Sequence, residues 1–401
     1  MKYMVILGDG MADEPIEALG GKTPLQYAET PTMDRLALCS EQGLAATIPE
    51  GMKPGSDTAN LAVLGYNPKI YYTGRSPLEA LSIGVDMKSD DIAMRTNIVT
   101  LSEEDVPYEE RTIIDHSSDE ISTEDAAILL EAVKEAFQTE EYQFYVGTSY
   151  RHLLIWAKGK VTELTPPHDI LTRKIGAYLP EDPVLREMMK KSFDILNNHP
   201  LNVKRAAEGK NKANSLWFWG AGTRPALSSF YEKTGKTGTM ISAVDLLKGI
   251  AVGAGMKNVI VPGANGGLHT NYEGKAEAAV KALLEDGSDF VYVHVEAPDE
   301  MGHQGSVERK VEAIRYLDQR LIRIVTEKLD ASGEDYRLLI MPDHPTPIRC
   351  RTHVADPVPY LLYDSRKKEG CGLLYSEENA KKTGVFVKEG YTLIDHLLEE
   401  N

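Results

Sequence analysis

The sequence predicts an α/β protein whose layered core carries a second, inserted α/β domain. Two observations predict the core: short apolar runs alternate with helical patterns, and acidic or histidine residues follow several of those runs. A third observation, the more charged and turn-rich chain between residues 92 and 205, predicts the insertion. We therefore expect a core of residues 1–91 plus 206–401 and an inserted domain of residues 92–205.

The first elements follow from local patterns. In KYMVILGDG, the apolar run Tyr3–Leu7 ends at Gly-Asp-Gly, which predicts a buried strand with Asp9 at its tip. Residues 30–43 have amphipathic spacing and predict a helix that ends at Gly43. LAATIP, at residues 44–49, predicts a second strand, and GSDTANLAVLGY predicts a loop that opens into a helix.

Later apolar runs predict the remaining strands of the core. They lie at residues 215–220, 237–242, 258–263, 289–298, 336–344 and 358–363. A long helical pattern covers 306–329, and within the insertion QFYVGTS and HLLIWA predict two short strands. Because ligand groups gather at the carboxyl ends of strands in such sheets, we expect Asp9, Asp299, Asp343 and His344 at one edge.

Composition excludes several functional classes. The chain has 401 residues, 42% apolar and 26% charged, which is typical of a soluble globular protein. Its net charge of −17 argues against non-specific nucleic-acid binding, which needs Lys and Arg to neutralise phosphates. The N-terminal apolar run is too short to span a membrane, and three cysteines without metal-site spacing suit a reducing compartment. We expect a cytoplasmic protein.

A set of strand-tip residues could bind two metal ions. Each motif alone is weak, because Asp and His also cap helices and occupy turns. Together, three carboxylates and three imidazoles suffice for two divalent cations, and the mixed N/O set suits Mn²⁺ or Zn²⁺, with Mg²⁺ as a third option. Two cations and three Asp leave a charge of about +1, which attracts a phosphate. The candidate ligands are Asp9, Asp299, His303, Asp343, His344 and His353.

Ser56 is the candidate nucleophile, since a metal or a helix N-terminus would favour its alkoxide. The alternative is that Ser56 is an ordinary N-cap. Candidates for phosphate recognition are Arg151, Arg224 and Lys248, each of which could equally be a solvated surface residue. No GxxxxGK[ST] loop is present, which argues against a P-loop nucleotide site.

Several motifs together resemble one known family. They are GDGMAD, GSDTANLAVLGY, YYTGRSPLEALSIG, SAVDLLKGI, VPGANGGLHTNYEGKA, HVEAPDEMGHQG and MPDHPTPIRCRTH. Across essentially the whole chain, this pattern resembles the alkaline phosphatase superfamily, and most closely the cofactor-independent phosphoglycerate mutases in their short, archaeal-type form. The resemblance implies an α/β/α sandwich core with an inserted α/β cap.

The resemblance also implies roles for individual residues. Asp9, Ser56, Asp343 and His344 would bind one metal, and Asp299, His303 and His353 the other. Ser56 would carry a phosphoserine during the interconversion of 2- and 3-phosphoglycerate, without 2,3-bisphosphoglycerate as cofactor. Arg224 and Arg151 would contact the substrate, and Lys248 is a weaker match. The insertion departs from the long-form pattern, so substrate contacts there are the least defined.

Three alternatives to this mutase function stay open. The same metal site could serve a phosphotransferase acting on another small hydroxy acid such as homoserine, because the metals contact the phosphoryl group and not the acceptor. It could also serve a phosphatase or phosphodiesterase; a sulfatase is disfavoured, because no C/S-x-P-x-R motif is present. The third alternative is a catalytically inactive binding protein on this fold.

Overall fold

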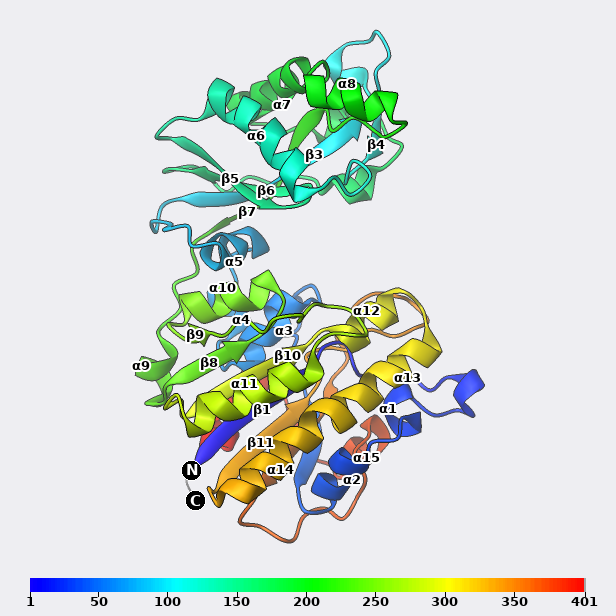
Figure 1. Ribbon diagram of the computed structural model, residues 1–401, viewed down its shortest axis with the longest axis vertical. Coiled ribbons are helices and arrows are strands. Elements are labelled where there is room, and N and C mark those ends of the chain that lie inside the picture. Colours follow the sequence, from blue (N-terminus) through cyan, green and yellow to red (C-terminus); the bar gives the residue numbers. More distant parts are fainter. Residues whose placement is uncertain (400–401) are drawn as a thin grey trace. The chain divides into compact units, whose positions relative to one another are not determined.

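The computed structural model describes residues 1–399 and consists of two compact units (Figure 1). The first unit comprises residues 1–72 and the chain from Leu227 onward, and the second comprises Thr73–Ala226. The boundaries therefore lie nearer to residues 72 and 227 than to the 91 and 206 that the composition predicts. The reason is that the strand predicted at 215–220 pairs within the second unit and not within the core.

The first unit is built on an eight-stranded sheet in the order β13-β2-β12-β11-β1-β10-β8-β9. Its strands are β1 (Lys2–Gly8), β2 (Glu41–Ala45), β8 (Gly238–Ile241), β9 (Lys257–Asn258), β10 (Phe290–Val295), β11 (Tyr336–Met341), β12 (Val358–Asp364) and β13 (Phe386–Val387). The central strand β1 pairs in parallel with both β10 and β11, so the carboxyl ends of all three meet at one edge. The candidate functional residues lie at this edge.

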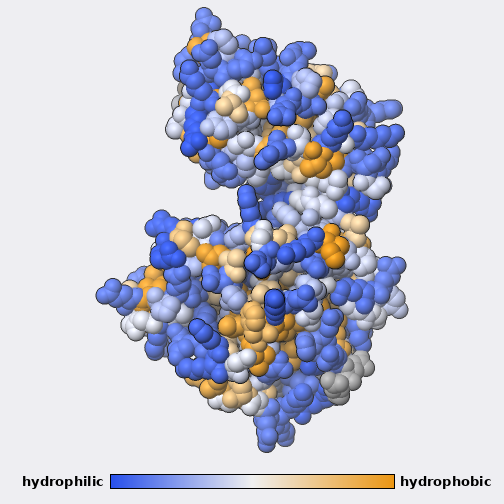
Figure 2. Space-filling model, turned by 180° about the vertical axis from the view of Figure 1, so that it is seen from behind, coloured by the Kyte–Doolittle hydropathy of each residue, from blue (hydrophilic) through white to orange (hydrophobic). Residues whose placement is uncertain are grey.

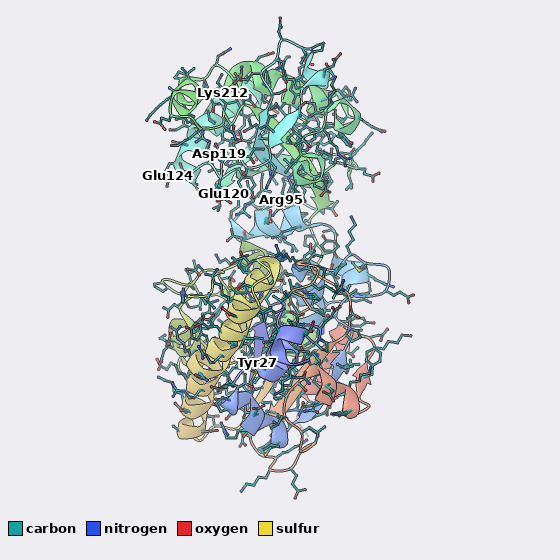
Figure 3. All side chains as sticks on the ribbon, turned by 90° about the vertical axis from the view of Figure 1, so that its right-hand side faces the viewer. Tyr27, Arg95, Asp119, Glu120, Glu124 and Lys212 are labelled. Carbon is teal, nitrogen blue, oxygen red and sulfur yellow. The ribbon has the colours of Figure 1, made fainter. Side chains whose placement is uncertain are left out.

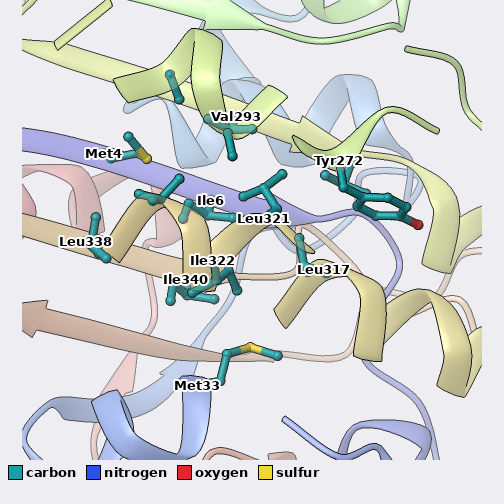
Figure 4. Close-up of a cluster of buried hydrophobic side chains, with 14 of the residues drawn as sticks. Met4, Ile6, Met33, Tyr272, Val293, Leu317, Leu321, Ile322, Leu338 and Ile340 are labelled. Atoms are coloured by element: carbon teal, nitrogen blue, oxygen red, sulfur yellow. The ribbon is translucent and has the colours of Figure 1, made fainter. Parts of the chain in front are cut away.

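Both faces of the central strand β1 are buried. On one face, Met4 and Ile6 of β1 pack into a large apolar cluster with residues of the covering helices (Figure 4). Tyr3 and Val5 alternate with them, point to the opposite face and are equally buried. Figure 1 shows α11 and α13–α14 lying over the sheet. The principal helices of this unit are α2 (Pro31–Leu38), α3 (Ser56–Val63), α10 (Asp245–Gly253), α11 (Tyr272–Leu284), α12 (Ala297–His303), α13 (Val307–Tyr316), α14 (Arg323–Ser332) and α16 (Leu393–Leu398).

The second unit contains a five-stranded sheet in which β3 pairs with β4, β6 and β7, and β5 pairs with β6. Its strands are β3 (Ile92–Leu101), β4 (Ile113–Asp115), β5 (Tyr142–Thr148), β6 (Arg151–Trp156) and β7 (Ser215–Thr223). Its main helices are α5 (Arg75–Ser82), α6 (Thr123–Phe137), α7 (Pro183–Leu196) and α8 (Pro200–Ala207). β5 and β6 coincide with the two strands predicted for the insertion.

A charged cluster lies inside the second unit. Arg95 of β3, labelled in Figure 3, is largely buried and pairs with Glu79 of α5, whose Oε2 accepts a hydrogen bond from Arg95 Nε at 2.8 Å. The Arg95 guanidinium also lies 4.6 Å from the ring centroid of Trp219 on β7. This cation–π and ion-pair cluster joins β3, α5 and β7, which explains why α5 and β7 fold with the second unit.

Several predicted elements differ from the structure. The strand predicted at residues 44–49 lies at Glu41–Ala45 instead. The helix predicted over 30–43 ends at Leu38, because Gly43 lies inside β2 opposite Tyr360, where a Cβ would be 2.9 Å from the Tyr360 ring. The strand predicted at 258–263 is limited to Lys257–Asn258. The helix predicted over 306–329 extends to Ser332 and includes a π-helical segment at Leu317–Ile322.

The surface is mostly polar, as the charged content of 26% predicts. The face seen in Figure 2 is mostly hydrophilic, with small, separate apolar areas. Exposed large apolar residues of the chain include Ile70, Val161, Tyr231 and Ile260. Among residues 1–399, no helix is both long and apolar enough to cross a membrane.

Candidate metal centre

The carboxyl ends of the three central strands bring the predicted ligands together. Asp9 follows β1 directly, and Asp343 and His344 come just after β11. β10 leads into the short helix α12, on which Asp299 and His303 lie one turn apart. The predicted clustering of these residues at one sheet edge is therefore what the structure contains, since β10, β1 and β11 are neighbours.

The first group of potential ligands surrounds His344. Asp9, Asp343 and His344 each offer a ligand atom, and these atoms lie within 4.8 Å of one another. His344 Nε2 is 3.4 Å from Asp9 Oδ1 and 3.4 Å from Asp343 Oδ2. Ser56 Oγ lies 3.1 Å from the same nitrogen, which places the candidate nucleophile directly beside this group.

The second group lies around Asp299. His303 Nε2 is 3.2 Å from Asp299 Oδ2, and His353 Nε2 is 3.4 Å from Asp299 Oδ1. The two imidazole Nε2 atoms are 3.0 Å apart. Asp299 and His353 also cluster with His344, so the two groups adjoin each other. All six predicted metal ligands and Ser56 thus contact at least one other member of the set.

The donors of the first group fit a divalent cation. Asp9 Oδ1 is buried and has no hydrogen-bond partner among the described residues. Burial raises the pKa of Asp9 well above its usual value, and the nearby carboxylates of Asp343 and Asp299 raise it further. A cation among these oxygens would offset that repulsion and would satisfy the unpaired oxygen.

In the second group, hydrogen bonds favour an ionised Asp299 and a protonated His303. Burial opposes ionisation of Asp299, but hydrogen bonds with His303 and His353 hold its pKa well below the usual value. The Asp299 hydrogen bond raises the pKa of His303 to about 9. Because a metal-bound imidazole must be neutral, cation binding at this group would release the proton of His303.

The local backbone is shaped to hold these side chains close together. Gly10 has φ +59°, and a Cβ on it would lie 2.5 Å from Thr346 Oγ1 and 2.6 Å from Asp299 Oδ1. Glycine is therefore required here both by the left-handed backbone and by the close approach of the two loops. Gly10 N also donates to Asp343 Oδ1 at 3.1 Å.

Ser56 is the first residue of α3, and Gly55 occupies the N-cap. Its hydroxyl makes no capping hydrogen bond and contacts His344 instead, so the ordinary N-cap interpretation of Ser56 is wrong. At this helix end, backbone N–H groups and the helix dipole favour negative charge. Negative charge on the Ser56 side chain would therefore be favoured at this position.

Comparisons with known proteins identify the family. A family model described as 2,3-bisphosphoglycerate-independent phosphoglycerate mutase matches residues 37–202. The protein of that name from Methanosarcina barkeri is 49% identical over 406 aligned residues, which cover 100% of both chains. The chain belongs to this family. A probable mutase of the family from Geobacter sulfurreducens is 48% identical over 405 residues, again covering 100% of both chains.

Solved structures agree with this family membership. The cofactor-independent phosphoglycerate mutase from Thermoplasma acidophilum is similar with a TM-score of 0.68 and 27% identity, and the match covers 99% of each chain. A protein from Pyrococcus horikoshii gives a TM-score of 0.82 and 30% identity over 100% of this chain and 98% of that one. Both the family resemblance and the α/β fold class predicted from the sequence are confirmed.

The three predicted substrate contacts of this mutase-family chain lie in both units. Arg224, after β7, donates from Nη1 to the carbonyl of Met87 at 2.8 Å. Arg151, at the start of β6, is exposed and its guanidinium lies 5.3 Å from the ring centroid of Tyr150. Lys248, on α10, pairs with Asp245 at 3.1 Å. Their role in substrate binding stays a prediction.

Sequence reasoning missed the buried polar residues behind the metal ligands. His294 of β10 contacts Asp9, and Asn60 of α3 contacts Asp343. The sequence analysis did not assign either residue a function, because neither lies at a strand tip. The signal that could have found them is a polar residue inside an apolar strand, as in FVYVHVEAP, since a buried polar group needs a partner.

Proposed function

We propose that this chain interconverts 2-phosphoglycerate and 3-phosphoglycerate through a phosphoserine on Ser56. Family membership supports the reaction. The observation that supports the nucleophile is the position of Ser56 Oγ at the N-terminus of α3, 3.1 Å from His344 Nε2 and beside the Asp9, Asp343 and His344 cluster.

We propose that Asp9, Ser56, Asp343 and His344 hold one divalent cation and that Asp299, His303 and His353 hold the other. The mixture of imidazole nitrogen and carboxylate oxygen favours Mn²⁺ or Zn²⁺. When bound, such cations act as Lewis acids that favour ionisation of a hydroxyl and offset charge on phosphoryl oxygens. The ligand residues fix where that charge is stabilised, because all of them except Ser56 lie in the segments that follow three adjacent strands of one sheet.

In the proposed reaction, Ser56 Oγ forms a bond to phosphorus while the bond from phosphorus to the glycerate oxygen breaks. The proton that Ser56 loses is balanced by the one that the leaving oxygen gains, which gives glycerate and phosphoserine. Attack by the other glycerate hydroxyl then reverses these steps and frees Ser56. The N-terminal N–H groups of α3 favour the negative phosphoserine through the helix dipole.

We further propose that residues 73–226 act as a substrate-binding cap, with Arg151 and Arg224 as cationic contacts and Lys248 as a third from the first unit. Arginine suits the carboxylate and phosphate of a phosphorylated hydroxy acid, because its planar guanidinium can make paired hydrogen bonds. Exclusion of water during the glycerate stage would separate a mutase from a phosphatase.

The decisive experiment uses Ser56→Ala, with Ser40→Ala as a matched control. Ser40 is buried, and its hydroxyl donates to the Leu36 carbonyl away from the ligand cluster. Conversion of 3-phosphoglycerate would be followed by ³¹P NMR in the presence of Mn²⁺. We expect Ser56→Ala to lose turnover and Ser40→Ala to keep it, while both retain bound metal. Turnover by Ser56→Ala, or release of inorganic phosphate in place of 2-phosphoglycerate by the wild type, would refute the proposal.

A further inference from the structure

Strand β10 places two buried polar side chains behind the metal centre. Tyr292 and His294 are two residues apart, so they point to the same face of the sheet. Both side chains are completely buried. Each makes a hydrogen bond that leads to a proposed metal ligand or to the nucleophile.

His294 contacts Asp9. Its Nε2 lies 2.8 Å from Asp9 Oδ2, and its Nδ1 lies 3.2 Å from Ser242 Oγ. Ser242 Oγ already accepts a hydrogen bond from Val244 N, so its own proton is available for Nδ1. With Nδ1 as acceptor, the ring proton lies on Nε2, which faces Asp9 Oδ2.

The contact with His294 fixes the orientation of the Asp9 carboxylate. Because His294 engages Oδ2, the carboxylate is held in one rotation, and Oδ1 is left without a hydrogen-bond partner. Oδ1 lies 3.4 Å from His344 Nε2, in the direction of the first ligand group. His294 thus separates a structural oxygen of Asp9 from a ligand oxygen.

Tyr292 acts through Asn60. The Tyr292 hydroxyl donates to Asn60 Oδ1 at 2.6 Å, which fixes the orientation of the amide. The Asn60 Nδ2 group then donates to Asp343 Oδ2 at 2.9 Å and to the Ser56 carbonyl at 2.8 Å. All polar groups of the Asn60 side chain are used, and one amide joins a metal ligand to the nucleophile residue.

We propose that Tyr292 and His294 are positioning residues for the phosphoryl-transfer site, with His294 aiming Asp9 at the metal and Tyr292 setting Ser56 and Asp343 through Asn60. This inference rests on the metal site and nucleophile of the proposed function. It predicts two different defects from two neighbouring positions on one strand. Loss of the His294 contact weakens metal binding, and loss of the Tyr292 contact slows turnover.

The first test measures Mn²⁺ affinity by equilibrium dialysis without substrate. We expect His294→Leu to weaken binding of one Mn²⁺ by about 10- to 100-fold, the usual effect of removing a hydrogen bond to a metal ligand. His294→Gln keeps an N–H at a similar distance from the backbone, so it should recover most of that affinity. Equal affinity of wild type and His294→Leu, or equal weakening in both variants, would overturn the role of His294.

The second test compares Tyr292→Phe with Tyr375→Phe in steady-state kinetics. Tyr375 is an equally buried tyrosine, and its hydroxyl donates to the Pro359 carbonyl at 2.7 Å outside the ligand cluster. We expect Tyr292→Phe to lower kcat by at least tenfold with KM and Mn²⁺ affinity changed less than threefold. Tyr375→Phe should leave kcat unchanged. An unchanged kcat in Tyr292→Phe, or equal losses in both variants, would overturn the role of Tyr292.

These tests separate this inference from the proposed function. If the wild type binds no divalent cation, both the metal site and the positioning role fail together. If the wild type binds Mn²⁺ and turns over 3-phosphoglycerate while His294→Leu and Tyr292→Phe match it, only the positioning role fails.

Discussion

Lys310 offers the sharpest test of what holds the site together. Its side chain, on α13, is fully buried, and its Nζ donates to Asp13 Oδ2 and to the Thr346 carbonyl, both at 2.8 Å, and to the Ala12 carbonyl at 3.3 Å. Ala12 and Asp13 follow Asp9, while Thr346 follows His344. One ammonium group therefore fixes both of the loops that carry the first group of ligands.

Lys310→Met keeps most of the side-chain volume and removes the charge. Three hydrogen bonds from a charged donor are lost, and Asp13 becomes a buried carboxylate without its cation. Removing one partner of a buried ion pair costs about 3–5 kcal/mol of unfolding free energy. At about 2–4 °C per kcal/mol for a unit of this size, the melting temperature should fall by about 6–20 °C.

The assay is thermal and urea unfolding followed by far-UV circular dichroism. Trp156, Trp217 and Trp219 all lie in the second unit, so tryptophan fluorescence reports that unit separately. The control is Lys328→Met, which breaks an exposed pair with Glu277 and should cost less than about 1 kcal/mol.

A second variant identifies why Lys310→Met loses unfolding free energy. In Lys310→Met with Asp13→Asn, the unpaired buried charge is gone, so part of the loss should be recovered. A loss below about 1 kcal/mol in Lys310→Met, or a loss no larger than that of Lys328→Met, would refute the reasoning.

Three further predictions concern metal, pH and backbone. A chelator should abolish turnover and lower the melting temperature of the first unit, and Mn²⁺ at about 100 times its Kd should restore about 2.7 kcal/mol; no shift would contradict the metal site. Burial lowers the pKa of His152 to about 4, so acidification from pH 6.5 to 4 should cost the second unit up to about 3 kcal/mol by tryptophan fluorescence. His152→Gln should remove the part of this dependence that comes from His152; a smaller part should remain, because burial also lowers the pKa of His168 in the same unit. Gly10→Ala should weaken Mn²⁺ binding at least tenfold in equilibrium dialysis, since its Cβ would overlap Thr346 and Asp299.

The strand-tip residues could be predicted because their signal is local. An apolar run that ends in Asp or Asp-His marks both the strand and its end, and parallel pairing then brings the tips together. The D-x-x-x-H spacing of Asp299 and His303 predicts one helix face, and α12 has that form. These inferences need only the order of residues along the chain.

The supporting contacts could not be predicted because they join distant segments. Tyr292 and Asn60 are 232 residues apart, and His294 and Asp9 are 285 apart. Nothing in the sequence near either partner specifies the pairing. Strand β3 was missed for a different reason: all ten of its residues are buried, so the strand lacks the alternation that marks a half-exposed strand.

The stretch MPDHPTPIRCRTH illustrates how local stiffness and distant contacts combine. Pro345 forms isolated bridges with Met11 and Ala12, so the loop after β11 runs against the loop after β1. Near its end, the Arg351 carbonyl lies 2.9 Å from His303 Nδ1. Because a carbonyl can only accept, it favours the tautomer with the proton on Nδ1 and leaves Nε2 facing Asp299 as a potential ligand. Arg351 therefore contributes through its backbone, and replacing its side chain should alter the metal site less than displacing that carbonyl would.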